Sequence, residues 1–544
     1  MDQRKYNEVF EQLESFILRE MEAFDIPAVG FSLVKDNEIK WQKGFGWQNS
    51  EQTIQASSDT VFRVGSVSKL FTAVAIMQLH EQKKLDIDQP IIEICPELTF
   101  KSDKPITLRH LLSHRAGILR ESPIGNYFDD MEPSIKETVL SILDNELIYE
   151  VGKKCKYSKL GPTIAGYILE KVTGTNFPLY VEQHIFKPLQ MYSSSFLFDK
   201  PVIKNNLADA YMVNFGGDLF PAPLFQLGTI PAGNLYSTVT DLSKFMICLL
   251  NGGKFNGGKI IEQTTLNEMF TPQFRSCQNS AEFGLGFAIG KYGKYKRFWH
   301  NGIIYGFASD FFGLIEPQIG VIVTNNVDSA VGFNEKIKFK ALNLLLNTLG
   351  YEDFPPEHKL IEPDTFSAKD YEGKYQSKEA DAWVWLKNND IIVQTMGVAK
   401  KISPVSKDKY ITNDRLSYGM PVEFERNREN EITVMKSGNI TYNKIKKYKA
   451  DYSIPPEYEK FVGDYGNAYN ILRIFVRDNR LFCLIEWFYE YPLTRVEDLI
   501  FAFPKYGLYD GEYIHFEEDE AGEIVAASAG FVRFEKLQEK VINE

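Results

Sequence analysis

A serine and a lysine three positions apart begin an apolar, helix-like segment, "FRVGSVSKLFTA" (62–73). On a helix, Ser66 and Lys69 would share one face, a turn apart. The unpaired N–H groups of a helix start favour negative charge, and a desolvated lysine loses its proton more easily. The pair therefore suits an activated serine nucleophile. A serine before a helix is more often an N-cap, and these two residues alone favour the cap.

Two further segments carry groups that can move protons. Tyr157 precedes an amphipathic, helix-like pattern in "CKYSKLGPTIAGYILEKVTG", where a nearby cation would lower its pKa. His300, Asn301 and Gly302 lead into an apolar, strand-like run, and a glycine there lets a substrate or another backbone approach closely. An exposed strand edge at this point could offer an N–H group to a developing oxyanion.

In this order, "SVSK", "YSK" and "HNG" resemble the S-x-x-K, Y-x-N and H-x-G elements of the serine β-lactamase and penicillin-binding-protein superfamily. Within it, the sequence looks most like the class C β-lactamase-like branch, which includes D-aminopeptidases, DD-peptidases and esterases. The resemblance covers about residues 10–350 and extends to "ITLRHLLSHRAGI", "PAGNLYSTVTDLSKFM" and "FGLGF".

The resemblance implies a role for each matched position. Ser66 would be the acylated nucleophile, and Lys69 and Tyr157 would share the acid and base work. His300 would help to bind substrate and hold the proton network. The backbone N–H groups of Ser66 and Ile303 would form the oxyanion hole. The implied substrate-binding positions are Lys159, Asn301, Gly302 and Ile303.

The implied function is hydrolysis of small peptides, amides or esters through an acyl-enzyme, without metal or cofactor. Lys159 departs from the family's asparagine, and a lysine only donates hydrogen bonds, which favours esters or acidic substrates over β-lactams and peptide amides. The alternative is that Lys159 points to solvent. Two other functions stay open: a non-catalytic binding or regulatory protein on the same scaffold, and a β-lactamase, which Lys159 and His300 disfavour.

The elements that would position these residues predict an α+β fold. An N-terminal amphipathic helix is followed by a hairpin around "KDNE" (35–38). A second hairpin turns at Pro317, and a further amphipathic helix ends at Gly350. Strands first, helices in the middle, then strands and a helix suggest an antiparallel sheet with helices packed on it. The apolar positions of the first helix are Phe10, Leu13, Phe16, Ile17, Met21 and Phe24.

The tail repeats itself: "KDYEGKYQS" at 369 matches "EKFVGDYGN" at 459, and "VWLKNNDIIV" matches "IFVRDNRLFC". We interpret it as two small antiparallel β-barrels, similar to the lipocalin-like tail of three-domain D-aminopeptidases. The alternative is unrelated β-sequences with shared turns. Residues 405–420 are a candidate for a loop that restricts the hydrolase cleft. The predicted domains are a hydrolase domain (1–354), a linker (355–365), a first module (366–447) and a second module (448–544).

Composition bounds the partners and the compartment. A net charge of −12 with no basic run argues against nucleic acid or an anionic membrane, so the expected partner is a small molecule or peptide. Five scattered cysteines predict reduced thiols, and His110 and His114 lack the glutamate of a zinc-protease motif. No apolar run could span a bilayer, and no signal peptide is apparent. We expect a cytoplasmic protein of undetermined oligomeric state, or alternatively an exported one whose signal is missing from this sequence.

Overall fold

The computed structural model describes residues 3–143, 146–214, 216–274, 282–362, 368–467 and 469–538. Cys277, the far end of the predicted linker and the two ends of the predicted tail lie outside these ranges. The chain divides into two compact units. The first comprises Met1–Met212 and Leu219–Glu357, and the second comprises Val213–Asp218 and His358–Glu544.

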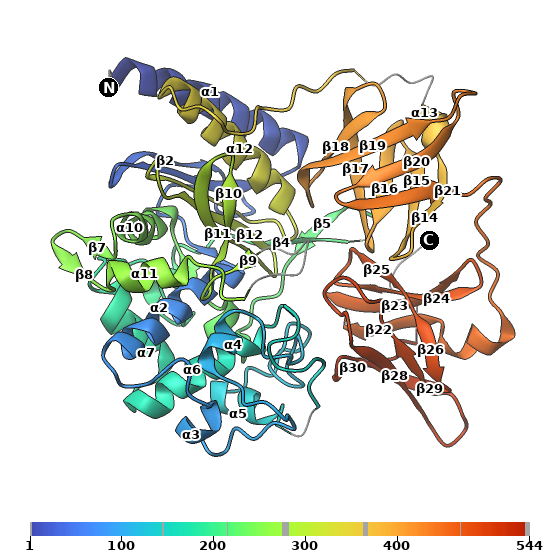
Figure 1. Cartoon of the computed structure of the whole chain (residues 1–544), viewed down its shortest axis with the longest axis horizontal. Helices are drawn as coiled ribbons and strands as arrows, with labels where there is room; N and C mark the ends of the chain where they lie inside the picture. The colour runs from blue at the N-terminus through green and yellow to red at the C-terminus, as the bar shows by residue number, and fades with distance from the viewer. Residues whose placement is uncertain are drawn as a thin grey trace. The chain divides into compact units, whose positions relative to one another are not determined.

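A seven-stranded antiparallel sheet, in the order β2-β1-β13-β12-β11-β10-β9, is the centre of the first unit. Every residue of β1, β12 and β13 is buried, which requires cover on both faces of the sheet. Helix α10 packs on β1 and β13, α12 packs on β12 and β13, and α1 lies beside α12 (Figure 1). The strands are β1 (Ala28–Lys35), β2 (Glu38–Gly46), β9 (Glu282–Phe283), β10 (Ala288–Tyr292), β11 (Tyr295–Ile304), β12 (Phe307–Leu314) and β13 (Ile319–Asn325).

Both predicted hairpins and both predicted amphipathic helices are present, so the α+β class is confirmed. Between the hairpins, α2 is the central helix of a helical layer and contacts α6 and α9. It is apolar on nearly all sides, as a helix enclosed by others must be. The helices are α1 (Gln3–Ala23), α2 (Ser68–Glu81), α3 (Ile91–Ile94), α4 (Leu108–Leu112), α5 (Ile135–Leu140), α6 (Leu160–Thr173), α7 (Phe177–Val181), α8 (Pro201–Lys204), α9 (Ile230–Gly233), α10 (Val239–Leu250), α11 (Gln263–Met269) and α12 (Val331–Thr348).

The first module is a closed eight-stranded antiparallel barrel. Each strand pairs with the next one along the chain, and the first strand, β14, pairs with the last, β21, to close the barrel. The strands are β14 (Gly373–Gln376), β15 (Asp381–Lys387), β16 (Asp390–Thr395), β17 (Val398–Ser406), β18 (Lys409–Asn413), β19 (Tyr418–Arg426), β20 (Ile432–Ser437) and β21 (Ile440–Lys444).

The second module follows the same strand order in two sheets. Strand β25 continues into β26 through Leu493, and a bridge between Tyr465 and Lys536 joins β22 to β30. The strands are β22 (Gly463–Asn467), β23 (Asn470–Arg477), β24 (Arg480–Ile485), β25 (Tyr489–Pro492), β26 (Thr494–Glu497), β27 (Ile500–Ala502), β28 (Tyr513–Glu518), β29 (Ile524–Ala529) and β30 (Val532–Glu535).

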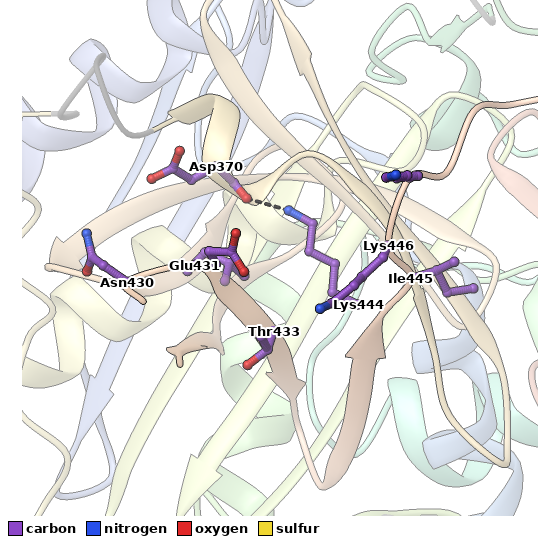
Figure 2. Close-up of a pocket in the computed structure, with 9 residues that line it drawn as sticks. Asp370, Asn430, Glu431, Thr433, Lys444, Ile445 and Lys446 are labelled. Atoms are coloured by element: carbon purple, nitrogen blue, oxygen red, sulfur yellow. Dashed lines mark hydrogen bonds between the residues drawn. The ribbon is translucent and has the colours of Figure 1, made fainter. Parts of the chain in front are cut away.

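Equivalent residues of the two modules make equivalent contacts. The Tyr375 hydroxyl donates to the Tyr371 carbonyl over 2.6 Å, and that of Tyr465 donates to the Phe461 carbonyl over 2.7 Å. Lys444 Nζ donates to the Asp370 carbonyl, and both residues line a hollow of about 440 Å³ (Figure 2). In the second module, Lys536 Nζ donates to the carbonyl of Lys460. Shared contacts in three dimensions support duplication over chance similarity. They also identify the Lys444 contact as part of the barrel closure.

The prediction of a projecting loop at 405–420 is wrong. Residues up to Ser406 complete β17, Lys409–Asn413 form β18, and β19 begins at Tyr418. Tyr410, Ile411 and Thr412 of β18 are all buried, so the middle of this segment is not an exposed loop. The polar residues that suggested a loop lie in these strands and in the tight turns between them.

The four described cysteines are free thiols: Cys95, Cys248 and Cys483 are buried and Cys155 is half-buried. Among the helices of the described ranges, none is long and apolar enough to cross a membrane.

Candidate active site

Ser66 lies in a short 3-10 turn, Gly65–Val67, and α2 begins directly after it at Ser68. The N-cap of α2 is Val67, and no side chain among the described residues caps this helix, so the N-cap interpretation of Ser66 is wrong. The Ser66 Oγ lies 2.9 Å from Lys69 Nζ and 2.8 Å from the Tyr157 hydroxyl. Three of the four predicted catalytic side chains therefore meet at one hydroxyl oxygen.

Lys69 is fully buried on the first turn of α2, and no carboxylate pairs with it among the described residues. Its Nζ also donates to the Ala232 carbonyl over 2.8 Å. Burial lowers the pKa of Lys69 to about 7, since the negative charge of Glu121 opposes the shift only in part and Arg120 adds to it. Near neutral pH the amine can therefore exist without its proton and accept one from Ser66.

Tyr157 precedes α6 and donates its hydroxyl proton to Ser66 Oγ. Burial raises the pKa of Tyr157, and this outweighs the hydrogen bond to Ser66 and the nearby charges of Lys159 and Arg120, which lower it. The condition raised from the sequence, a pKa lowered by a cation, is not met, because the phenol is taken out of water. Tyr157 rests as a neutral donor.

His300, on β11, is buried beside Tyr157, with 6.2 Å between the ring centroids. Its Nδ1–H donates to the Asn301 carbonyl oxygen over 2.6 Å. Burial and the charge of Lys69 lower the pKa of His300 to about 3, so the ring is neutral and Nε2 is an acceptor. No described residue donates to that buried Nε2.

Two glycines let β11 lie directly against the turn that carries Ser66. A Cβ at Gly65, where φ is 51°, would stand 2.9 Å from the backbone N of Ile303. A Cβ at Gly302 would stand 2.0 Å from the Val64 carbonyl oxygen. Only glycine allows this approach, which brings the backbone of Ile303 to the turn around Ser66. The side chain of Asn301, by contrast, is exposed.

Lys159 is buried and does not point to solvent, which rules out the alternative raised from the sequence. Its Nζ lies 2.9 Å from Glu121 Oε1 and 4.1 Å from the centre of the Tyr127 ring. Arg120 also bonds Glu121. Burial opposes ionisation of Glu121, but Lys159 and Arg120 outweigh it and lower its pKa. An ionised, buried pair therefore occupies the position where the family has an asparagine.

Residues 231–235 belong to the site, although the sequence indicated no role for them beyond the family resemblance. Ala232 accepts from Lys69, Pro231 accepts from the Thr72 hydroxyl over 2.6 Å, and the Leu235 N–H donates to Ser68 Oγ over 3.0 Å. Residues on the first turns of α2 are thus bonded to one short segment, which fixes the direction of Lys69. In the sequence, only the small residues of this segment indicated that another element could pack closely against it.

No group of three histidine, cysteine, aspartate or glutamate side chains in the described part of the chain could hold a metal ion. His110 forms the capping box of α4 with Thr107, so its side chain has a structural role at the start of that helix.

Comparison with known proteins places this geometry in a family. The Beta-lactamase family model matches residues 13–344, well over half of the chain. Beta-lactamase-like protein 2 of Dictyostelium discoideum is 30% identical over 275 residues, which are 48% of this chain and 49% of that protein. The teichoic acid D-alanine hydrolase of Staphylococcus aureus is 27% identical over 264 residues, 47% of this chain and 61% of that protein. The chain thus spans about half of the length of the first relative and three fifths of the second.

Solved structures support the fold at lower sequence identity. An octameric penicillin-binding protein homologue from Pyrococcus abyssi has a TM-score of 0.59 and 24% identity, and it covers 82% of this chain and 100% of its own. The D-amino acid amidase of Ochrobactrum anthropi has a TM-score of 0.54 and 23% identity, covering 63% of this chain and 99% of its own. At these identities the likeness shows the fold alone.

Proposed function

The chain belongs to the Beta-lactamase family, a family of serine hydrolases, and we propose that it hydrolyses small peptides, amides or esters through an acyl-enzyme on Ser66. One observation carries the proposal: Ser66 Oγ lies within hydrogen-bond distance of both Lys69 Nζ and the Tyr157 hydroxyl. A lysine with a pKa of about 7 supplies a base, and a phenol that keeps its proton supplies an acid.

In the first half-reaction the Ser66 hydroxyl gives its proton to neutral Lys69 as Oγ bonds to the substrate carbonyl carbon. The carbonyl oxygen becomes an oxyanion, which the backbone N–H groups of Ser66 and Ile303 stabilise. The bond to the leaving nitrogen or oxygen then breaks, and the leaving atom takes a proton from the Lys69–Tyr157 pair. The product is an ester of Ser66.

Water completes the cycle in the second half-reaction. Its oxygen bonds to the ester carbon while its proton passes to neutral Lys69. The bond between that carbon and Ser66 Oγ breaks, and Oγ recovers the proton. The acid is released and the resting hydrogen bonds form again.

The substrate class follows from the groups beside Ser66 and from the relatives. Two similar proteins are a teichoic acid D-alanine hydrolase and a D-amino acid amidase, which makes D-aminoacyl esters and amides the first class to test. Lys159, Asn301, Gly302 and Ile303 are the proposed substrate contacts. Lys159 offers donors only, whereas an asparagine also accepts, so we expect esters to react faster than amides or penicillin.

Covalent labelling tests the nucleophile directly. A fluorophosphonate should label the wild-type protein once, at Ser66, as read by intact mass and peptide mapping. Ser66→Ala should not be labelled. Ser406→Ala is the matched control, because Ser406 and Lys409 form a second S-x-x-K pattern in the first module. Wild-type labelling of Ser66→Ala, or loss of labelling in Ser406→Ala, would contradict the proposal.

A substrate panel then tests the reaction. We expect kcat/KM to fall from p-nitrophenyl acetate and D-alanine esters to D-alanine p-nitroanilide and then to penicillin G. Penicillin should acylate Ser66 and leave slowly. A penicillin value well above the ester values would identify a β-lactamase, and no turnover of any ester would favour the non-catalytic alternative.

A further inference from the structure

One residue, His114, makes three contacts around Tyr157. The His114 carbonyl accepts from the N–H of Lys156 over 2.8 Å, and its ring Nδ1 accepts from the N–H of Ser158 over 3.3 Å. These two amides flank Tyr157 in the chain. The imidazole also lies against the phenol, with 4.5 Å between the centroids and 37° between the planes. His114 therefore fixes the backbone on both sides of Tyr157 and one face of its ring.

His114 is itself held rigidly. It is 3% exposed, and Phe283 packs edge-on against its ring at 4.9 Å. Its φ of 57° is left-handed, a conformation that a residue with a Cβ keeps only where its surroundings impose it. Burial, with Lys69 and His300 nearby, holds the pKa of His114 well below its usual value. The ring is neutral, and its Nδ1 lone pair is available to accept from Ser158.

We propose that His114 is a positioning residue for the hydrolytic reaction, holding the Tyr157 hydroxyl against Ser66 Oγ without touching the reacting atoms. The inference rests on the proposed function, since it matters only if Tyr157 transfers a proton. It assigns a use to a histidine that the sequence left as structural, because no zinc-protease glutamate accompanies His110 and His114. A catalytic group displaced by about 1 Å can lose on the order of 100-fold in rate.

Two variants form a matched pair, His114→Gly and His114→Asn. Glycine and asparagine both adopt left-handed φ values readily, so neither adds backbone strain. Asparagine keeps a short side-chain acceptor that can bond the Ser158 N–H, whereas glycine removes both the acceptor and the ring. The readout is the rate of Ser66 labelling by a fluorophosphonate. Thermal unfolding is measured in parallel.

We expect His114→Gly to be labelled about 10- to 100-fold more slowly than wild type. His114→Asn should recover a clear part of that loss. In a Tyr157→Phe background, His114→Gly should change the rate by less than about 2-fold, because the hydroxyl that His114 positions is gone. Equal losses in both backgrounds, or wild-type labelling of His114→Gly, would overturn the inference.

Failure of the proposed function has a different signature. Either the wild-type protein would not be labelled at Ser66, or Tyr157→Phe would be labelled at the wild-type rate. If His114→Gly does not fold, His114→Asn decides between the same outcomes. A loss that appears only when Tyr157 is present supports the positioning role, and a loss in both backgrounds or in neither refutes it.

Discussion

Acylation of Ser66 should depend on pH through Lys69. The protonated amine cannot accept the serine proton, so the rate should follow the neutral fraction of Lys69. With a pKa of about 7, that fraction rises from about 9% at pH 6 to about 91% at pH 8, as for any single titrating group. We therefore expect acylation to be about 10-fold faster at pH 8 than at pH 6, with a midpoint near pH 7.

Two buried neighbours allow that midpoint to be moved in opposite directions. The carboxylate of Glu121 raises the pKa of Lys69, and the guanidinium of Arg120 lowers it. Glu121→Gln should therefore shift the midpoint to lower pH, and Arg120→Gln should shift it to higher pH. The two shifts should have opposite signs, because removing a negative charge lowers the pKa of a nearby amine and removing a positive charge raises it.

The assay is the rate constant for fluorophosphonate labelling between pH 5 and 9 at constant ionic strength. Circular dichroism at each pH shows that the folded state persists. A flat profile in the wild-type protein would refute the role of Lys69 as the base. Midpoint shifts of the same sign in Glu121→Gln and Arg120→Gln would refute the electrostatic account of its pKa.

Three further predictions follow from the same groups. The folded pKa of Lys69 lies below its unfolded value, so its buried charge destabilises the fold fully below about pH 7 and progressively less as pH rises toward about 10.4. Lys69→Met should therefore raise the free energy of unfolding by on the order of 1–4 kcal/mol at pH 6, and by less at pH 10, as measured by denaturant titration. The same variant should be inactive in ester assays. Lys159→Asn should raise the amide-to-ester ratio of kcat/KM by about 10-fold, and an unchanged ratio would argue against contact with substrate. EDTA should leave ester hydrolysis unchanged, since Lys69 and Tyr157 supply every proton transfer, and a loss restored by zinc would contradict this.

The parts of the site that the sequence predicted are those with fixed spacing along the chain. Ser66 and Lys69 are three residues apart, so any helical turn brings them together whatever packs around it. Tyr157 and His300 were candidates from their local sequence, but only a resemblance predicted that they join Ser66, because no local rule brings residues so far apart in sequence to one place. Their contact depends on how β11 and α6 pack, which the periodicity of either segment does not specify.

The residues that sequence reasoning missed act through tertiary contacts. Nothing in the sequence around Glu121 indicates its buried ion pair with Lys159. Nothing around His114 indicates its hydrogen bond to the Ser158 N–H, next to Tyr157. The sign of the pKa shift of Tyr157 was also out of reach, since it depends on burial that only the packed structure defines. In the tail, the repeat indicated the strand pattern, but the polar residues at 405–420, which lie in strands and tight turns, looked like a loop.

The charge states around Ser66 have one common cause. Burial lowers the pKa values of Lys69, His114 and His300 and raises that of Tyr157, so all four move toward the neutral form. In the proposed acylation, the proton that moves from neutral serine to neutral amine creates charge as the substrate is attacked, and the proposed oxyanion hole of fixed backbone N–H groups would stabilise the negative part of that charge. The Glu121 carboxylate stays ionised because two cations contact it, and it does not bond to Lys69. A direct salt bridge would have kept Lys69 protonated and removed the base. In the proposed mechanism, the absence of a direct bond between Glu121 and Lys69 therefore matters as much as the contact between Lys69 and Ser66.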